Sequence, residues 1–299
     1  MVPGYVNVAT DQGDRSYQED RYVVYRYDTS EEKGWLLAIM DGHSGSAEVA
    51  ELCEKNLQTY FNNLAALVFE HTDAVLENIL KNTISALHEA TKDMYSGSTV
   101  SLVYISETKA KAFVAILGDS PVMIKNKNGS LVMSMEHNAR TNLAEREAAV
   151  QRGAVYDGGY IWDDPQSDMG TGLQLTRGLG DKKLARYISR EPEIYSVDLD
   201  PESFVAVMSD GVVDPGHKDQ KDISNRLFLL ITNGATAVDL VNDSLKRKTG
   251  DNVTAIVWRK YFVNRNWENL SVMCFATIAV FILVHTCSSM KFEMSRCDP

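Results

Sequence analysis

Short apolar runs that end on an acidic residue constrain this chain more than any other feature. Three such runs occur, and a fourth acid, Asp251, precedes another apolar run. The three runs with their acids are Leu36–Met40 with Asp41, Ala112–Leu117 with Asp119, and Phe204–Met208 with Asp210. Short apolar runs bounded by polar sequence are typical of strands that are buried on both faces. The pattern therefore predicts several buried strands with acidic side chains at their ends.

Acidic side chains at the ends of buried strands are costly unless a positive charge compensates them. Four of them suggest one rim lined with carboxylates, and hard oxygen ligands of this kind select Mg²⁺ or Mn²⁺. A single Asp41-Gly42 pair is more often an ordinary turn, so the hypothesis depends on the repetition. Gly42 also lets the backbone approach a ligand closely, and His43 adds a group that titrates near neutral pH.

The composition narrows the class of protein. The net charge of −11 argues against a nucleic-acid partner held by phosphate contacts. None of the four cysteines is spaced as Cys-x-x-Cys, which makes a zinc site or a redox motif a weak interpretation. The polar sequence from Met1 to Gln18 lacks the apolar core of a secretory signal. We therefore expect a reducing, cytoplasmic environment for the body of the protein.

The C-terminal part has a different composition. Residues 270–285 contain no Asp, Glu, Lys or Arg, and basic residues flank them on both sides. Extended to residue 287, the run reaches the roughly 17–25 residues that span a bilayer. We therefore divide the chain into a domain of residues 1–259 and a tail of residues 260–299. In one interpretation the segment 270–287 anchors the cytoplasmic domain to a membrane; in the other it is a helix packed on the domain or buried in a partner.

The order of predicted elements is not the regular alternation of a doubly wound sheet. Helix pairs are predicted at 47–64 with 73–93 and at 221–233 with 235–247, and strands occupy most of the remaining sequence. Two mainly antiparallel sheets packed together, with the helix pairs outside, fit this α+β order. The predicted strands are 5–9, 21–27, 36–40, 97–105, 111–117, 122–125, 131–134, 193–199, 204–209 and 252–258.

A segment rich in Gly and Asp, residues 154–173, follows a short predicted helix at 143–152. It is long for a connection without structure of its own. Long connections of this kind are usually functional, so we expect a flap beside the site.

Seven motifs occur in one order along the chain, and together they are far more specific than any of them alone. They are Arg15-x-x-x-Glu19-Asp20, Asp41-Gly42-His43-x-Gly45, Gly97-Ser98-Thr99, Gly118-Asp119-Ser120, Thr176-Arg177-x-Leu179-Gly180-Asp181, Ser209-Asp210-Gly211-x-x-Asp214 and Asp251-Asn252. Over residues 5–258 the chain resembles the metal-dependent serine/threonine protein phosphatases of the 2C type. The resemblance implies a four-layer α/β/β/α sandwich, a monomeric catalytic domain, a phosphoprotein substrate and two Mg²⁺ or Mn²⁺ ions, with a third bound more weakly.

The resemblance also implies roles for particular residues. Arg15 would bind the substrate phosphate, and His43 would protonate the leaving alkoxide. Asp20, Asp181 and Asp214 would be supporting or structural acids, with Asp181 fixing the end of the flap. The implied metal ligands are Glu19, Asp41, the carbonyl of Gly42, Asp119 for the third ion, Asp210 and Asp251.

These roles agree with the chemistry of phosphate monoesters. Two metal ions can activate a bridging water and screen the phosphate, Arg offers a planar fork for phosphate oxygens, and His can donate a proton at neutral pH. The alternative interpretation of Arg15 is a plain surface ion pair with Glu19.

The sequence departs from the pattern of the family at three places. Pro121 follows Gly-Asp-Ser where Arg is usual, Asn138-Ala139 follow His137 where a basic or small residue and Pro are usual, and Ser44 stands where Gly is common. These changes bear on substrate recognition more than on the metal acids. They keep two alternatives open: a catalytically weak, phosphatase-like regulatory binding protein, and a phosphoesterase that acts on a small molecule.

Overall fold

The computed structural model describes residues 5–166, 170–213 and 220–260, without the side chains of residues 220–222. The described residues all lie in the unit Met1–Tyr261. Asp214 and the candidate membrane segment 270–287 lie outside them, and the division of the chain at residue 259 stays a prediction. Among the helices of the described ranges, none is both long enough and apolar enough to cross a bilayer.

The larger sheet is antiparallel and is built around the strand that carries Asp41. Its order is β12-β4-β3-β5-β6-β13, with β2 also paired to β3. Its strands are β2 (Asp20–Asp28), β3 (Lys33–His43), β4 (Gly97–Ser98), β5 (Val100–Ser106), β6 (Lys111–Leu117), β12 (Leu179–Gly180) and β13 (Glu193–Asp198). The predicted strand 97–105 is thus divided into β4 and β5, and β4 turns aside to pair with the end of β3.

The smaller sheet is also antiparallel, with the order β1-β15-β14-β7-β8. It brings the first strand of the chain beside the last, with Tyr5 opposite Arg259. Its strands are β1 (Tyr5–Asp11), β7 (Val122–Lys125), β8 (Leu131–Met133), β14 (Phe204–Met208) and β15 (Val253–Arg259).

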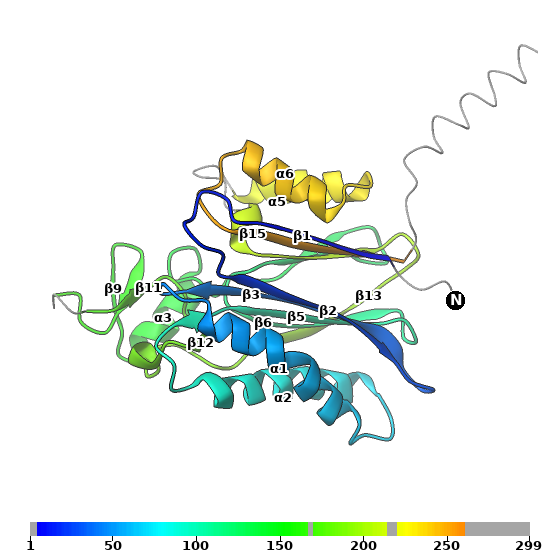
Figure 1. Ribbon diagram of the computed structural model, residues 1–299, viewed down its shortest axis with the longest axis horizontal. Helices are drawn as coiled ribbons and strands as arrows, with labels where there is room; N and C mark the ends of the chain where they lie inside the picture. Colours follow the sequence, from blue (N-terminus) through cyan, green and yellow to red (C-terminus); the bar gives the residue numbers. More distant parts are fainter. Residues whose placement is uncertain (1–4, 167–169, 214–219, 261–299) are drawn as a thin grey trace, which may run out of the picture. The chain divides into compact units, whose positions relative to one another are not determined.

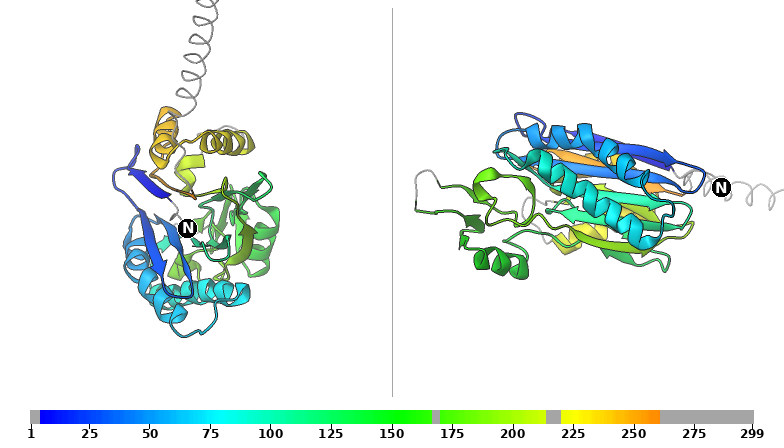
Figure 2. Two further views of the ribbon diagram at one scale, coloured as in Figure 1. Left: turned by 90° about the vertical axis from the view of Figure 1, so that its right-hand side faces the viewer. Right: turned by 90° about the horizontal axis from the view of Figure 1, so that it is seen from below.

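Helices cover the outer face of each sheet, so that four layers are stacked (Figure 1). The larger sheet is covered by α1 (Glu48–Ala65) and α2 (Asp73–Thr91), which lie side by side across its strands (Figure 2). The smaller sheet is covered by α5 (Gln220–Thr232) and α6 (Ala237–Lys246), with the short α4 (Asp210–Val213) beside them. The four-layer α/β/β/α sandwich expected from the resemblance is therefore confirmed.

This stacking explains why β3 is apolar at almost every position. Leu37 and Ile39 point into the core between the two sheets, whereas Leu36, Ala38 and Met40 point into the core under α1 and α2. A strand between a sheet and a helix layer has no solvent face, so its alternating positions are all apolar. The strand therefore delivers Asp41 from the centre of the protein to its surface.

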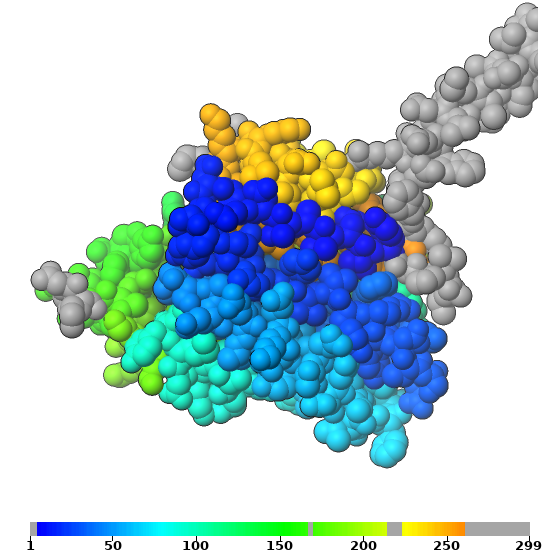
Figure 3. Space-filling view, in the orientation of Figure 1, coloured from blue at the N-terminus to red at the C-terminus, as the bar shows by residue number. Residues whose placement is uncertain are grey.

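The predicted flap has more structure than the sequence indicated. After α3 (Leu143–Gln151), the strands β9 (Val155–Asp157), β10 (Tyr160–Trp162) and β11 (Gly172–Leu173) form a small antiparallel sheet over its own apolar core. The 3-10 helix η1 (Lys182–Leu184) follows. The flap lies beyond the end of the larger sheet, on the left of Figure 1, and projects from the surface in the space-filling view of Figure 3.

Candidate active site

The acids predicted from strand ends lie together at one end of the two sheets. Asp20, the first residue of β2, stands directly opposite Asp41 in the pairing of β2 with β3. At the end of the smaller sheet, a Cβ on Gly211, the residue after Asp210, would lie 3.2 Å from Cβ of Asp251. The charges of Asp210 and Asp251 act on Asp41, so the ends of the two sheets face each other here. The four acids predicted from strand ends lie close to Asp20 and Glu19, whose charges act on theirs. Together we call these six residues the carboxylate rim: Glu19, Asp20, Asp41, Asp119, Asp210 and Asp251.

The end of β3 is held rigidly by its neighbour Thr99. The backbone N–H of Asp41 donates to Thr99 Oγ1 at 3.0 Å, and the N–H of Thr99 donates to the carbonyl of Asp41 at 2.9 Å. Gly42 donates to the carbonyl of Glu19 at 3.3 Å, and a Cβ on Gly42 would lie only 2.9 Å from that oxygen. The glycine is therefore needed for the two chain segments to approach each other.

Asn252 holds the loop that carries Arg15 and Glu19, a role that the sequence did not indicate. Its Oδ1 accepts the N–H of Glu19 at 2.8 Å. Its Nδ2 donates to the carbonyls of Gln12 at 2.8 Å and Tyr17 at 3.0 Å. The Asn252 side chain is buried, and the only feature of the sequence that could have drawn attention to it is its place directly after Asp251.

The carboxylate rim lacks the compensation that buried acids normally have. Glu19 and Asp20 are 7% and 4% exposed, and neither Asp20 oxygen nor Oε1 of Glu19 has a hydrogen-bond partner among the described residues. Burial is the main reason that the pKa of Asp20 is raised to about 6; the hydroxyls of Thr254 and Ser209 oppose the rise, and the charge of Asp251 adds to it. Such orphaned acceptors are rare in folded proteins and call for a partner outside the chain.

The partly exposed acids of the carboxylate rim also repel one another. Burial raises the pKa of Asp41 well above its usual range, and the charge of Asp210 adds to this. The pKa of Asp210 is raised in the same way, by burial and by the charge of Asp119. Burial likewise raises the pKa of Asp119 to about 6. Without a cation, the folded protein therefore holds the protons of these acids more tightly than the unfolded chain does.

The donor set fits a hard divalent cation by its chemistry and its charge. Carboxylate oxygens and a strand-end carbonyl are the ligands that Mg²⁺ and Mn²⁺ prefer. Both Asp20 oxygens and Oε1 of Glu19 have no hydrogen-bond partner among the described residues. Within the described ranges, no group of three or more Asp, Glu, His or Cys side chains already encloses a position for an ion. The ligation expected from the sequence is therefore taken up below as a proposal.

Arg15 lies at the carboxylate rim, but its acidic partner is not the one considered from the sequence. Its guanidinium donates to Asp251 Oδ2 at 2.7 Å and to the carbonyl of Gly250 at 3.0 Å. The described ion pairs join Arg15 to Asp251 and not to Glu19. The Arg15 side chain is 51% exposed, so it remains accessible to a ligand that arrives from solvent.

His43 reaches the site from the last position of β3 and meets Asp181. The distance from His43 Nε2 to Asp181 Oδ2 is 2.8 Å. Burial alone lowers the pKa of His43, but the Asp181 carboxylate more than offsets this, and the net pKa is raised. Asp181, which the sequence suggested as an anchor of the flap, therefore belongs to the site itself.

Asp119 is held by Asn138, one of the residues at which the sequence departs from the pattern that it otherwise resembles. Asn138 Nδ2 donates to Asp119 Oδ2 at 2.8 Å. His137 makes two hydrogen bonds with Gly118, the residue before Asp119. The His137 N–H donates to the carbonyl of Gly118 at 3.1 Å, and His137 Nδ1 accepts the N–H of Gly118 at 3.2 Å. Asn138, which stands where a basic or small residue is usual, thus makes a polar contact with the Asp119 carboxylate.

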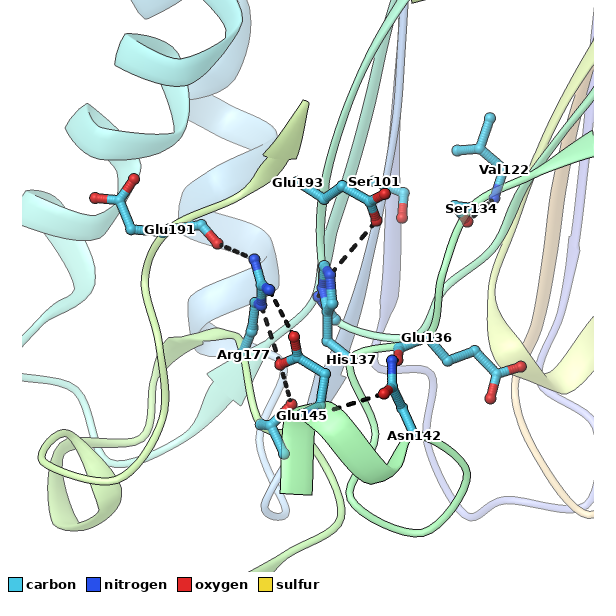
Figure 4. A network of polar contacts seen from close by, with 12 residues as sticks. Ser101, Val122, Ser134, Glu136, His137, Asn142, Glu145, Arg177, Glu191 and Glu193 are labelled. Atoms are coloured by element: carbon cyan, nitrogen blue, oxygen red, sulfur yellow. Dashed lines mark hydrogen bonds and ion pairs between the residues drawn. The ribbon is translucent and has the colours of Figure 1, made fainter. Parts of the chain in front are cut away.

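His137 is part of a buried polar network at the base of the flap (Figure 4). At its centre, Arg177 donates to both carboxylate oxygens of Glu145, at 2.6 and 3.1 Å, and Thr176 donates to one of them at 2.8 Å. Burial raises the pKa of Glu145, but these hydrogen bonds outweigh it, and the net pKa is lowered. Burial and the charge of Arg177 lower the pKa of His137 to about 4, so this imidazole is neutral.

Comparison with known proteins agrees with this geometry. A chain of Arabidopsis thaliana described as probable protein phosphatase 2C 11 is 30% identical over 255 residues, which cover 83% of this chain and 64% of that one. Probable protein phosphatase 2C 45 of Oryza sativa subsp. japonica is 26% identical, with 84% of this chain and 86% of the relative covered. A solved serine-threonine phosphatase 2C from Toxoplasma gondii has the same fold, with a TM-score of 0.65, 19% identity and coverage of 86% and 95%.

Several of these relatives are longer than the part that matches. The match covers 64%, 56% and 37% of three Arabidopsis relatives, the last of which is described as a protein kinase and PP2C-like domain-containing protein. The sequence model of the family named protein phosphatase 2C matches residues 6–222. The chain therefore belongs to the protein phosphatase 2C family.

Proposed function

We propose that this chain hydrolyses phosphoserine and phosphothreonine in proteins, with a metal-activated water at a binuclear Mg²⁺ or Mn²⁺ centre. The observation that carries the proposal is the carboxylate rim, whose acids are withdrawn from water without enough positive charge to balance them. Membership of the protein phosphatase 2C family supports the same reaction. The names of the relatives support a protein substrate.

In this proposal Asp41 and the carbonyl of Gly42 would hold the two ions. Asp210 and Asp251 would bind them from the smaller sheet, Glu19 would bind directly or through water, and Asp119 would hold a third ion more weakly. When bound, the ions lower the pKa of a water molecule and screen the charge of the phosphate. The raised pKa values of the carboxylate rim support this, because cations would make ionisation of these acids favourable again.

Two further side chains act on the substrate. Arg15 binds phosphate oxygens with its guanidinium, whose planar fork matches their geometry. The Arg15 side chain is exposed at the edge of the carboxylate rim, so its guanidinium can contact the phosphate from the solvent side. His43 gives a proton to the leaving alkoxide of serine or threonine, which is a poor leaving group without one.

The test compares two substrates under two conditions. A phosphoserine peptide and an aryl phosphate are each incubated with the full chain in Mn²⁺ and then in excess chelator. We expect turnover of both in Mn²⁺ and of neither in chelator. Binding of the phosphopeptide without turnover would favour the regulatory binding protein, and turnover of the aryl phosphate without the peptide would favour a small-molecule phosphoesterase.

The location of the protein stays a prediction. We propose that segment 270–287 anchors a monomeric, cytoplasmic catalytic domain to a membrane, on the strength of its uncharged composition and basic flanks. Alkaline carbonate extraction of the full chain and of a variant truncated after Tyr261 tests this. Full-length protein that remains wholly in the soluble fraction would argue for the docked helix instead.

A further inference from the structure

The contact between His43 and Asp181 joins two residues that are 138 positions apart in the sequence. Asp181 is 4% exposed, and its backbone has a φ of +49°, in the left-handed region that non-glycine residues seldom occupy. Residues in such conformations persist only where their surroundings hold them, and they are concentrated at functional sites. The carboxylate is therefore placed beside the imidazole at a cost to the local backbone.

The structure makes room for this contact at one position, Gly97 in β4. Gly97 stands opposite His43 in the pairing of β3 with β4, and opposite Gly180 in the pairing of β4 with β12. A Cβ on Gly97 would lie 2.2 Å from both His43 Nε2 and Asp181 Oδ2. The two side chains thus meet across a strand that has no side chain between them.

Backbone contacts fix Asp181 on the far side of this strand. Its N–H donates to the carbonyl of Ser96 at 2.9 Å, and its carbonyl accepts the N–H of Leu184 at 2.9 Å. Arg190 donates to the carbonyl of Gly180 at 2.6 Å and to that of Gly178. These contacts anchor the turn that presents Asp181, and they leave Oδ2 free to accept a hydrogen bond from His43.

We propose that Asp181 is the positioning residue of His43: it accepts a hydrogen bond from Nε2–H and so leaves Nδ1 as the nitrogen that faces the substrate. The inference rests on the proposed function, because it assigns the orientation of the proposed proton donor. A histidine held through one nitrogen has its tautomer and ring orientation fixed for the other. Among the described residues, Nδ1 of His43 has no hydrogen-bond partner.

The reaction step is balanced as follows. The oxygen of the activated water forms a bond to phosphorus, the bond from phosphorus to the serine Oγ breaks, and His43 Nδ1 gives its proton to Oγ. His43 is left neutral with its proton on Nε2, hydrogen-bonded to Asp181. The proton released when the water is activated goes to solvent, and a solvent proton restores His43.

The test uses the full chain in Mn²⁺ and the variant Asp181→Asn, which is nearly isosteric. General acid catalysis contributes about 10²–10⁴-fold, so we expect kcat on a phosphoserine peptide to fall by about 10- to 100-fold. On an aryl phosphate, whose leaving group needs little protonation, kcat should change far less. KM and the affinity for Mn²⁺ measured by calorimetry should stay close to those of the unaltered chain.

A double variant separates positioning from a merely structural role. If Asp181 acts through His43, Asp181→Asn should cause no further loss in a His43→Gln background. The matched control is Asp93→Asn, which removes an exposed carboxylate that pairs with Lys182, next to Asp181 in the sequence. Equal losses on both substrates, or losses that add in the double variant, would overturn the proposal.

A measurement that does not depend on turnover keeps the two proposals apart. The imidazole ¹⁵N NMR signals of the unaltered chain, assigned by comparison with His43→Gln, report the tautomer of His43 directly. We expect a protonated Nε2 whose shift changes in Asp181→Asn. A proton on Nδ1 alone in neutral His43 would refute the positioning role even in an active enzyme, whereas absence of turnover with the expected tautomer would refute only the proposed function.

Discussion

The acids of the carboxylate rim and Glu145 are all withdrawn from water, but their surroundings differ in the positive charge and the hydrogen bonds that they supply. Glu145 receives a bidentate contact from Arg177 and a third hydrogen bond from Thr176, and its pKa is lowered. Asp20 in the carboxylate rim has no hydrogen-bond partner among the described residues for either oxygen, and its pKa is raised to about 6.

The difference separates a structural acid from an acid kept for a ligand. A buried carboxylate that already has its cation and its hydrogen bonds stabilises the local packing, and it has little capacity left for an added ion. A group of carboxylates that repel one another gains most from a cation that arrives from outside. Burial of an acid therefore does not identify a site, whereas burial without compensation does.

The largest expected effect comes from removing a charge of the carboxylate rim. Asp41→Asn or Asp210→Asn should lower kcat by roughly 10³-fold, because metal ions supply several kcal/mol of stabilisation and each 1.36 kcal/mol is tenfold in rate. In chelator, the free energy of unfolding should stay the same or rise, since one repelling charge is lost. Steady-state kinetics and thermal denaturation measure the two effects.

Asp28 in β2 provides a matched control for Asp41→Asn and Asp210→Asn. Asp28 lies at the end of β2 opposite to Asp20 and pairs with Lys33 on the surface. Asp28→Asn should leave kcat unchanged. Turnover of Asp210→Asn at the level of the unaltered chain would show that the carboxylate rim does not hold the catalytic metal.

At Glu145 we expect a loss of stability rather than a loss of metal binding. Glu145→Gln leaves the Arg177 guanidinium without its carboxylate, and breaking a buried ion pair of this kind should lower the free energy of unfolding by about 3–5 kcal/mol. Binding of Mn²⁺ should be retained. Denaturant unfolding and calorimetry test both parts, and a variant of normal stability that no longer binds Mn²⁺ would contradict the comparison.

Four acids of the carboxylate rim, Asp41, Asp119, Asp210 and Asp251, were predictable from local pattern, whereas Glu19 and Asp20 were indicated only by the resemblance. An apolar run buried on both faces must end where the sheet ends, so an acid after such a run lies at an edge of the sandwich. The order of strands and helix pairs was predictable for the same reason. The small sheet of the flap was missed because its strands are two or three residues long and show no periodicity.

The contacts between distant side chains were not predictable in this way. Asp181 meets His43 only because β4 lies between β3 and β12 with a glycine at the crossing point. Arg15 bonds Asp251, which is 236 residues away and lies next to the loop only after β1 and β15 have paired. Both contacts depend on strand register, which a single sequence does not reveal.

The pH dependence of stability should differ between the two regions as well. The pKa of Asp20 is about 6 in the folded chain, against about 3.9 for an unfolded aspartate, so the folded state binds its proton more tightly. In chelator, stability should therefore fall as the pH rises from about 4 to about 6, by roughly 2–3 kcal/mol from this residue.

The variant Asp20→Asn isolates this contribution. It should be more stable than the unaltered chain at pH 7 in chelator, and the advantage should shrink towards pH 4, where Asp20 is protonated in the folded state and about half protonated in the unfolded state. Excess Mg²⁺ should also reduce the advantage at pH 7. Unfolding curves at the two pH values measure it, and an advantage that is the same at both would mean that Asp20 ionises normally.

The smallest effect is expected at Arg15, the cation that already contacts the carboxylate rim. Arg15→Ala should raise KM for a phosphopeptide by about tenfold, since loss of a charge-assisted hydrogen bond at an exposed position costs about 1.4 kcal/mol. The value of kcat at saturating substrate should change little. An unchanged KM with a lower kcat would mean that Arg15 positions the Asp251 carboxylate and does not bind the substrate.

Calorimetric titration of Mn²⁺ into the chelator-treated full chain tests the central claim most directly. The account predicts that the unaltered chain and Glu145→Gln each bind at least two ions, and that Asp41→Asn loses this binding because the Asp41 carboxylate is the proposed ligand of both ions. Absence of Mn²⁺ binding by the unaltered chain, or equal binding by Asp41→Asn, would contradict the claim that the uncompensated carboxylates form a metal centre.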